Sequence, residues 1–173
     1  MKTFFVALTL SILSATTAFA QSEEIRQRET LRGLPGVFVL LEGLGADIKR
    51  DGLTEEQLRT DVEIRLRRAG IRVLTEREAK ESPMKPLLLI TVKSLKSDPL
   101  SKLLEANIYS FGFFIELRQA ASLARMPPNE FLVTTWNDGA IGFATAKNLR
   151  VIRDGLGDYV DKFANAFLTV NPK

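Results

Sequence analysis

The chain has 173 residues with 24 basic and 21 acidic side chains, and it contains neither histidine nor cysteine. The lack of both residue types removes the commonest general base, the usual zinc ligands and every disulfide or thiolate site. A net charge of +3 gives no reason to expect a nucleic-acid partner. No motif predicts a bound cofactor or metal, so the composition favours a binding or accessory protein over an enzyme.

Residues 1–20 have the order of a cleavable secretory signal, with Lys2 before an apolar run and small residues at Ala18 and Ala20. The apolar run is shorter than the roughly 20 residues that a membrane-spanning helix needs. We expect cleavage between Ala20 and Gln21, and a mature chain without a transmembrane segment. The absence of cysteine and of an Asn-x-Ser/Thr sequon favours a bacterial periplasmic or secreted location over a eukaryotic route.

The mature chain is predicted to consist of a short leader and one domain. Residues 21–33 are polar apart from Ile25 and Leu31, which predicts a flexible, loosely held leader, with a short amphipathic helix as the alternative. Residues 34–173 are enough for a single domain with a hydrophobic core and too few for two.

The domain is predicted to open with a strand and a helix. The unbroken apolar run over 37–41 indicates a strand that is covered on both faces and central in its sheet. A helix over 54–69 follows, because Thr54 and Gln57 form a capping box and Gly70 ends the pattern. The ion pairs expected on its wet side, at four-residue spacing, are Asp61–Arg65 and Glu63–Arg67.

The remaining elements follow from apolar runs, alternation and turn residues. Strands are predicted over 71–74, 87–92, 106–123 and 131–136, and a closing helix over 148–169. A loop is expected over 75–85, and turns at 126–129 and 137–139. The fold class is therefore α+β, with a single mixed sheet of about five strands in the order β-α-β-β-β-β-α and two helices packed on one face.

The long strand over 106–123 supplies the candidate binding residues. Its odd-numbered side is apolar from Tyr109 to Leu117, whereas its even-numbered side mixes Phe114, Glu116 and Arg118. If helices cover the apolar side, the mixed side faces outward and can hold a partner. Glu116 and Arg118 can alternatively form a simple sheet-face ion pair. Trp136, the single tryptophan, is either a core residue or an interface anchor.

Three segments, 52–63, 134–136 and 170–173, resemble a group of small exported bacterial proteins of unknown function. The order of elements also resembles small periplasmic α+β domains such as the N-terminal domain of TolB. Neither resemblance brings an activity or a site to transfer, because fold does not imply function.

The leading hypothesis is an exported, non-enzymatic binding or accessory protein of the cell envelope, with an envelope protein as its partner. One alternative is a carrier of an apolar small molecule, with a pocket between the closing helix and the aromatic side of the sheet. The other is a hydrolase that works with carboxylates alone, which needs two acids facing one cleft.

Overall fold

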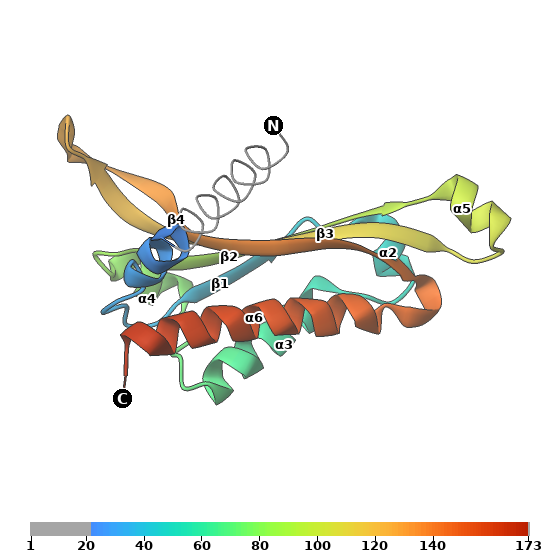
Figure 1. Ribbon diagram of the computed structural model, residues 1–173, viewed down its shortest axis with the longest axis horizontal. Coiled ribbons are helices and arrows are strands. Elements are labelled where there is room, and N and C mark those ends of the chain that lie inside the picture. The colour runs from blue at the N-terminus through green and yellow to red at the C-terminus, as the bar shows by residue number, and fades with distance from the viewer. Residues whose placement is uncertain (1–21, 173) are drawn as a thin grey trace, which may run out of the picture.

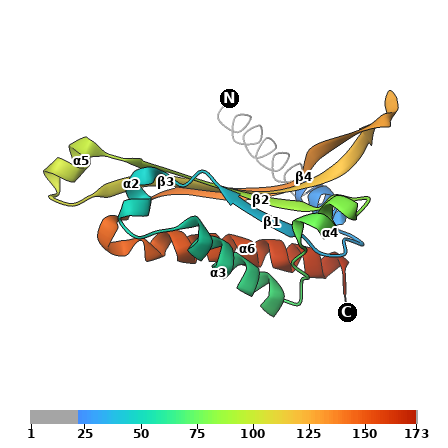
Figure 2. The ribbon, with the colours of Figure 1, turned by 180° about the vertical axis from the view of Figure 1, so that it is seen from behind.

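One mixed β-sheet runs the length of the molecule and carries its two long helices on a single face (Figures 1 and 2). The computed structural model describes residues 22–172, without the side chain of Pro128. The expected signal and its cleavage site at Ala20 and Gln21 therefore lie outside the described residues. The strands are β1 (Phe38–Glu42), β2 (Leu87–Lys96), β3 (Ile108–Leu123) and β4 (Met126–Thr145). The long helices are α3 (Glu55–Arg68) and α6 (Arg150–Val170).

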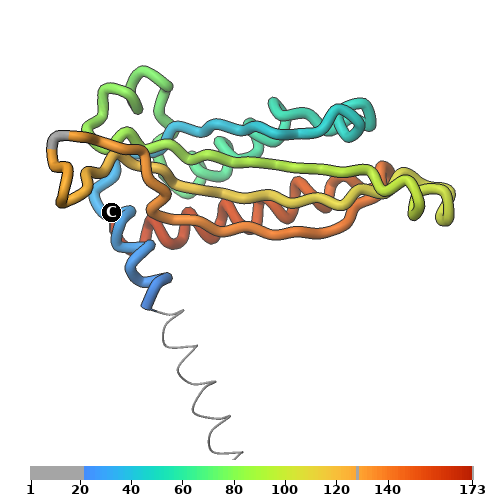
Figure 3. The backbone as a smooth tube through the Cα atoms, turned by 90° about the horizontal axis from the view of Figure 1, so that it is seen from above, coloured from blue at the N-terminus to red at the C-terminus, as the bar shows by residue number. Residues whose placement is uncertain are grey.

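The strand order β1-β2-β3-β4 follows the chain (Figure 3). β1 pairs with β2 in parallel, and the other two pairs are antiparallel. The predicted α+β class, the mixed sheet and the placement of two helices on one face are confirmed. The predicted strand over 71–74 is reduced to one parallel bridge, between Val37 and Val73.

The first strand was expected at the centre of the sheet, and this expectation is wrong. β1 is the outermost named strand on its side, with only the Val37–Val73 bridge beyond it. Val39 is buried against the helical layer, whereas Leu40 is exposed on the other face. The apolar run over 37–41 therefore does not correspond to a strand that is buried on both faces.

The hairpin of β3 and β4 is longer than predicted. Its turn falls at Ala124-Arg125, and β4 then continues through both expected turns, at 126–129 and 137–139. At the second of these, the Asp138 carboxylate accepts the Gly139 N–H at 2.8 Å without ending the strand. The pairing register shifts between Leu117 and Arg118, and the outer part of the hairpin rises from the sheet beyond this end (Figure 1).

Helix α3 begins as its sequence predicts, but its ion pairs differ. The Thr54–Gln57 capping box is present, and Glu63 pairs with Arg67 at 2.7 Å. Arg65 instead reaches α6, where it pairs with Asp161 at 2.6 Å. A side chain at Gly157 would collide with the Arg65 guanidinium, so this glycine makes room for the contact between the helices.

Short helices occupy most of the connections between these elements. α2 (Ala46–Arg50), α4 (Glu76–Glu81) and α5 (Asp98–Leu103) are α-helical, and η1 (Ala146–Asn148) is a 3₁₀ turn. α4 replaces the loop expected over 75–85. It begins with a second capping box, in which the backbone N–H of Thr75 hydrogen-bonds to Glu78 and lowers the pKa of that carboxyl.

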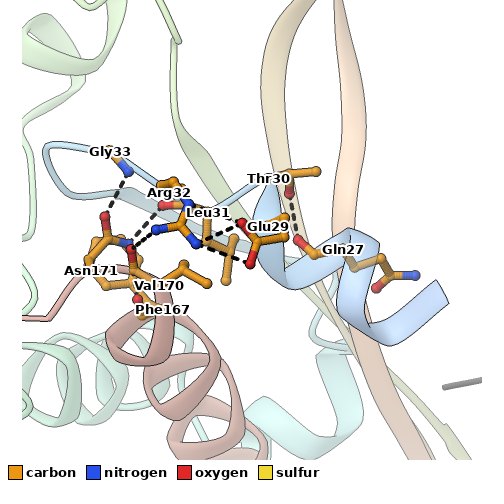
Figure 4. A network of polar contacts seen from close by, with 9 residues as sticks. All are labelled: Gln27, Glu29, Thr30, Leu31, Arg32, Gly33, Phe167, Val170 and Asn171. Carbon is orange, nitrogen blue, oxygen red and sulfur yellow. Dashed lines mark hydrogen bonds and ion pairs between the residues drawn. The ribbon is translucent and has the colours of Figure 1, made fainter. Parts of the chain in front are cut away.

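The segment predicted as a loosely held leader is attached to the domain. Residues 22–29 are helical, as in the alternative prediction, and Leu31 is fully buried in the core. Figure 4 shows how the amide of Asn171 holds this segment. Its Nδ2 donates to the Leu31 carbonyl at 2.9 Å, and its Oδ1 accepts the Gly33 N–H at 2.7 Å. This segment is largely polar in sequence, and Asn171, which holds it, lies 138 or more positions away along the chain. The attachment was therefore not predicted.

Candidate functional site

The sheet has a covered face and an uncovered face, and they receive alternate side chains of the same strands. Tyr109, Phe113 and Ile115 of β3 are buried against the helical layer. The alternate positions Ser110, Gly112 and Phe114 lie on the other face, which carries no helix of the described chain along its centre (Figures 1 and 2). We call this surface the open face. Phe114, Glu116 and Arg118 lie on it, as the alternation predicts.

An apolar groove of about 530 Å³ crosses the open face over β2, β3 and β4. Its main walls are Leu95, Phe114, Ile141 and Phe143, whose exposed fractions are 72%, 48%, 82% and 70%. Among the described residues that line it, Lys93 alone is charged. We call this feature the open-face groove. Four large apolar side chains exposed together are typical of an interaction surface, whereas single exposed ones need no explanation.

Gly112 gives the open-face groove its depth. Gly112 of β3 lies directly opposite Ile141 in the register. A Cβ built on Gly112 would approach the Ile141 side chain to 3.3 Å and the Phe114 ring to 3.5 Å. The absence of a side chain at this position therefore leaves the space between Phe114 and Ile141 open.

Glu116 and Arg118 form the predicted sheet-face ion pair. The guanidinium of Arg118 donates to Glu116 Oε2 at 2.6 Å from Nη2 and at 3.1 Å from Nε. They continue the row of Phe114 along β3, outside the lining of the groove. The pair gives the open face a polar border, and each charge is already satisfied by the other.

Trp136 lies on the covered face. The register places it opposite Leu117, so its side chain points toward the helices. It is 6% exposed, and its ring meets Phe163 of α6 edge-on at 5.1 Å between ring centres. Of the four proposed binding residues, Trp136 is therefore the one that the structure separates from the others.

Three groove residues, Leu95, Ile141 and Phe143, were not predicted. The turn expected at 137–139 interrupted the alternation of β4, which hid the fact that Ile141 and Phe143 share one face. Leu95 lies between Lys93 and Lys96, and this polar stretch predicted the end of a strand. Continuing the alternation through 137–145 would have found two of the three.

The space proposed for a small-molecule carrier, between α6 and the aromatic side of the sheet, is occupied by packed rings. Phe113 meets Tyr159 of α6 edge-on at 5.2 Å between ring centres, and Phe163 lies against Trp136. Phe163 is fully buried. This side of the sheet is therefore hydrophobic core.

A cleft between α3 and α6 contains the acids Asp61, Asp154 and Asp161. Each carboxylate pairs with an arginine, and the Asp61–Arg153 contact is bidentate, at 2.8 and 3.0 Å. The hydrogen bond to Asp61 raises the pKa of Arg153. These carboxylates are partly exposed, and their pairing with arginines is typical of surface ion pairs. Within residues 22–172, no group of three acidic side chains is arranged to hold a metal ion.

The most perturbed titratable group is Tyr109, at the end of the sheet near α2. Its hydroxyl donates to Asp51 Oδ2 at 2.6 Å, and Asn107 Nδ2 donates to the same oxygen at 3.3 Å. Burial, followed by the hydrogen bond to Asp51, raises the pKa of Tyr109 to about 12. A phenol that keeps its proton so strongly and lies in the core is a structural group.

No family model matches the chain, and no curated protein resembles it in sequence. None of the helices in the described part of the chain is long and apolar enough to cross a membrane.

Proposed function

We propose that this is an exported, non-enzymatic accessory protein of the bacterial cell envelope, and that the open-face groove holds a segment of an envelope protein. The observation that carries the proposal is the clustering of Leu95, Phe114, Ile141 and Phe143 on a face that no described helix covers. Burial of such side chains is the main favourable term in protein association.

The shape of the groove favours a protein segment over an enclosed small molecule. A small-molecule site usually buries 70–90% of its ligand within a cavity. The open-face groove is instead a shelf on a sheet, walled by side chains of three strands. A partner that presents bulky apolar side chains can fill it while the Glu116–Arg118 pair stays at the border in water.

Site-specific photo-crosslinking in the natural host tests this function. A benzophenone amino acid is placed at Leu95 or Phe114, and at Ile64 of α3 or Val151 of α6 as controls on the helical layer. The controls suit the purpose because Ile64 and Val151 are 39% and 41% exposed. We expect the same exported protein to be crosslinked from both groove positions and from neither control.

Two results would contradict the proposal. Crosslinking that is equal at the groove and at the controls would show non-specific contact. Native mass spectrometry that finds a retained apolar small molecule, lost in Phe114→Ser, would assign the groove to a carrier instead.

Export is tested separately by sequencing the N-terminus of the protein from its natural host. The proposal requires a chain that begins at or near Gln21. A chain that retains Met1 would contradict cleavage of the signal, on which the proposed export rests.

A further inference from the structure

The outer edge of β4 is capped near its middle and free from there to its end at Thr145. Near its middle, the Asn137 N–H donates to Gln27 Oε1 of the N-terminal helix at 3.3 Å. Two residues on, the Gly139 N–H donates to the carboxylate of Asp138 at 2.8 Å. Both N–H groups therefore point away from β3 and are satisfied by side chains.

The same geometry leaves Ile141 and Phe143 uncapped. Backbone groups alternate sides along a strand, so the N–H and C=O of these two residues also point away from β3. In the described part of the chain, no side chain hydrogen-bonds to them. The edge over 139–145 has the sequence Gly-Ala-Ile-Gly-Phe-Ala-Thr, which contains no charge and no proline.

Elsewhere the sheet shows the usual protection of its edges. The outer strand β1 has only five residues, and Val37, just before it, already forms a parallel β-bridge with Val73. The first part of β4 contains Pro127 and Pro128, which cannot donate to an added strand. Proteins normally shorten, charge or cover an exposed edge to prevent further pairing. Beyond the capped Gly139, the described edge over 140–145 has none of these devices, so it is open to pairing.

We propose that a second copy of this chain adds its own 139–145 edge to this one, antiparallel, about a two-fold axis at Gly142. The window is bounded on one side by the capped Gly139 and on the other by the end of β4 at Thr145, and Gly142 is its midpoint. Antiparallel pairing about this point uses the whole free edge. An interface with two-fold symmetry also needs only one self-complementary surface.

The register brings complementary side chains together. Ile141 of one copy lies opposite Phe143 of the other, twice by symmetry, so two aliphatic–aromatic pairs form on the open face. Ile141 and Phe143 are both largely exposed in the single chain, so pairing each with the other covers both. This self-complementarity about Gly142 favours a second copy over an unrelated strand.

The dimer extends the open face instead of hiding it. Strand addition leaves Ile141 and Phe143 on the same face of a continuous sheet, where the two open-face grooves lie side by side. Dimer formation through the free edge does not require a partner in the open-face groove. The dimer is therefore tested separately from the proposed function.

Sedimentation velocity of the full chain, purified from its natural host, tests the dimer. We expect a monomer–dimer equilibrium that Ile141→Lys shifts at least tenfold toward monomer, because it places a charge in the paired edge. Phe143→Lys should weaken the dimer in the same direction. The control is Leu103→Lys, at an equally exposed leucine of α5, which should leave the equilibrium unchanged. A wild-type chain that stays monomeric at every concentration, or an Ile141→Lys variant that dimerises normally, would overturn the proposal.

Disulfide trapping tests the register, and the cysteine-free chain allows it without background. Directly opposed residues lie about 5.5 Å apart between Cα atoms, within disulfide range, whereas diagonal neighbours lie roughly 7–8 Å apart. A mixture of Ile141→Cys and Phe143→Cys chains should therefore form a mixed disulfide dimer faster than either variant alone. Faster bridging in a single variant would reject the axis at Gly142.

Discussion

The two faces of strand β3 carry similar side chains in opposite environments. On the covered face, Phe113 is 2% exposed and packs against Tyr159 of α6, whereas Phe114, its neighbour in sequence, is 48% exposed on the open face. Hydrophobicity therefore does not decide which face becomes core. The amphipathic helix α6 does, because it supplies the matching apolar surface to one face only.

This comparison separates residues that hold the fold from residues that are free to bind. Side chains on the covered face are surrounded, so their removal leaves a cavity. Side chains on the open face border water and contribute little to the unfolding free energy. Substitutions on the two faces should consequently have different effects.

The largest effect is expected for Phe113→Ala. The substitution removes a ring from the packed core, and we expect the free energy of unfolding in urea to fall by about 3–5 kcal/mol. A loss below about 1 kcal/mol would mean that α6 does not pack on this face.

A smaller loss is expected for Asn171→Ala, which frees the N-terminal segment from the end of α6. The change leaves the Gly33 N–H without its acceptor and leaves the Leu31 carbonyl with only the 3.4 Å hydrogen bond from the Leu34 N–H. We expect a loss of about 2 kcal/mol and faster amide exchange at residues 31–33. Asn129→Ala, at an exposed position of the hairpin, is the matched control and should change stability by less than about 0.5 kcal/mol.

Tyr109→Phe should cost about 1.5 kcal/mol at neutral pH, because Asp51 loses a hydrogen bond. The wild type should also show a pH dependence. The raised pKa means that the folded state binds the phenol proton more tightly, so this contribution is complete below pH 10 and is lost as the pH rises toward 12. Urea unfolding across this range should show the decline in wild type and in Tyr159→Phe, which retains Tyr109. Persistence of the full decline in Tyr109→Phe would contradict the assignment.

The smallest effect on stability is expected for Phe114→Ala. Because the ring is half exposed, the free energy of unfolding should change by less than about 0.5 kcal/mol. Photo-crosslinking from Leu95 should nevertheless be strongly reduced, since the groove loses a wall. If Phe114→Ala unfolds the protein as Phe113→Ala does, the two faces are not different in the way described.

Local signals predicted the elements that they directly specify. The Thr54–Gln57 capping box gave the start of α3, and strict alternation gave the two faces of β3. The same signals misplaced the turns of β4, because an Asn-Asp-Gly sequence remains a strand when a long partner such as β3 continues beside it. Tertiary pairing overrode the local turn preference.

The parts that could not be predicted depend on contacts far apart in sequence. Nothing near Arg65 indicates that Asp161, 96 positions later, will replace Asp61 as its partner. The attachment of residues 31–33 to Asn171 is equally remote. Trp136 could be placed on the covered face only once its register with Leu117 was known.

Thiol labelling in intact cells tests the binding role of the open face most directly. Single-cysteine variants Phe114→Cys and Ile64→Cys are compared in the purified protein and in cells of the natural host, with a reagent that enters the envelope. The account predicts that Phe114→Cys reacts readily when purified and slowly in cells, whereas Ile64→Cys reacts alike in both. Equal reactivity of Phe114→Cys in both settings would show that the open face is uncovered in the cell and would contradict the account.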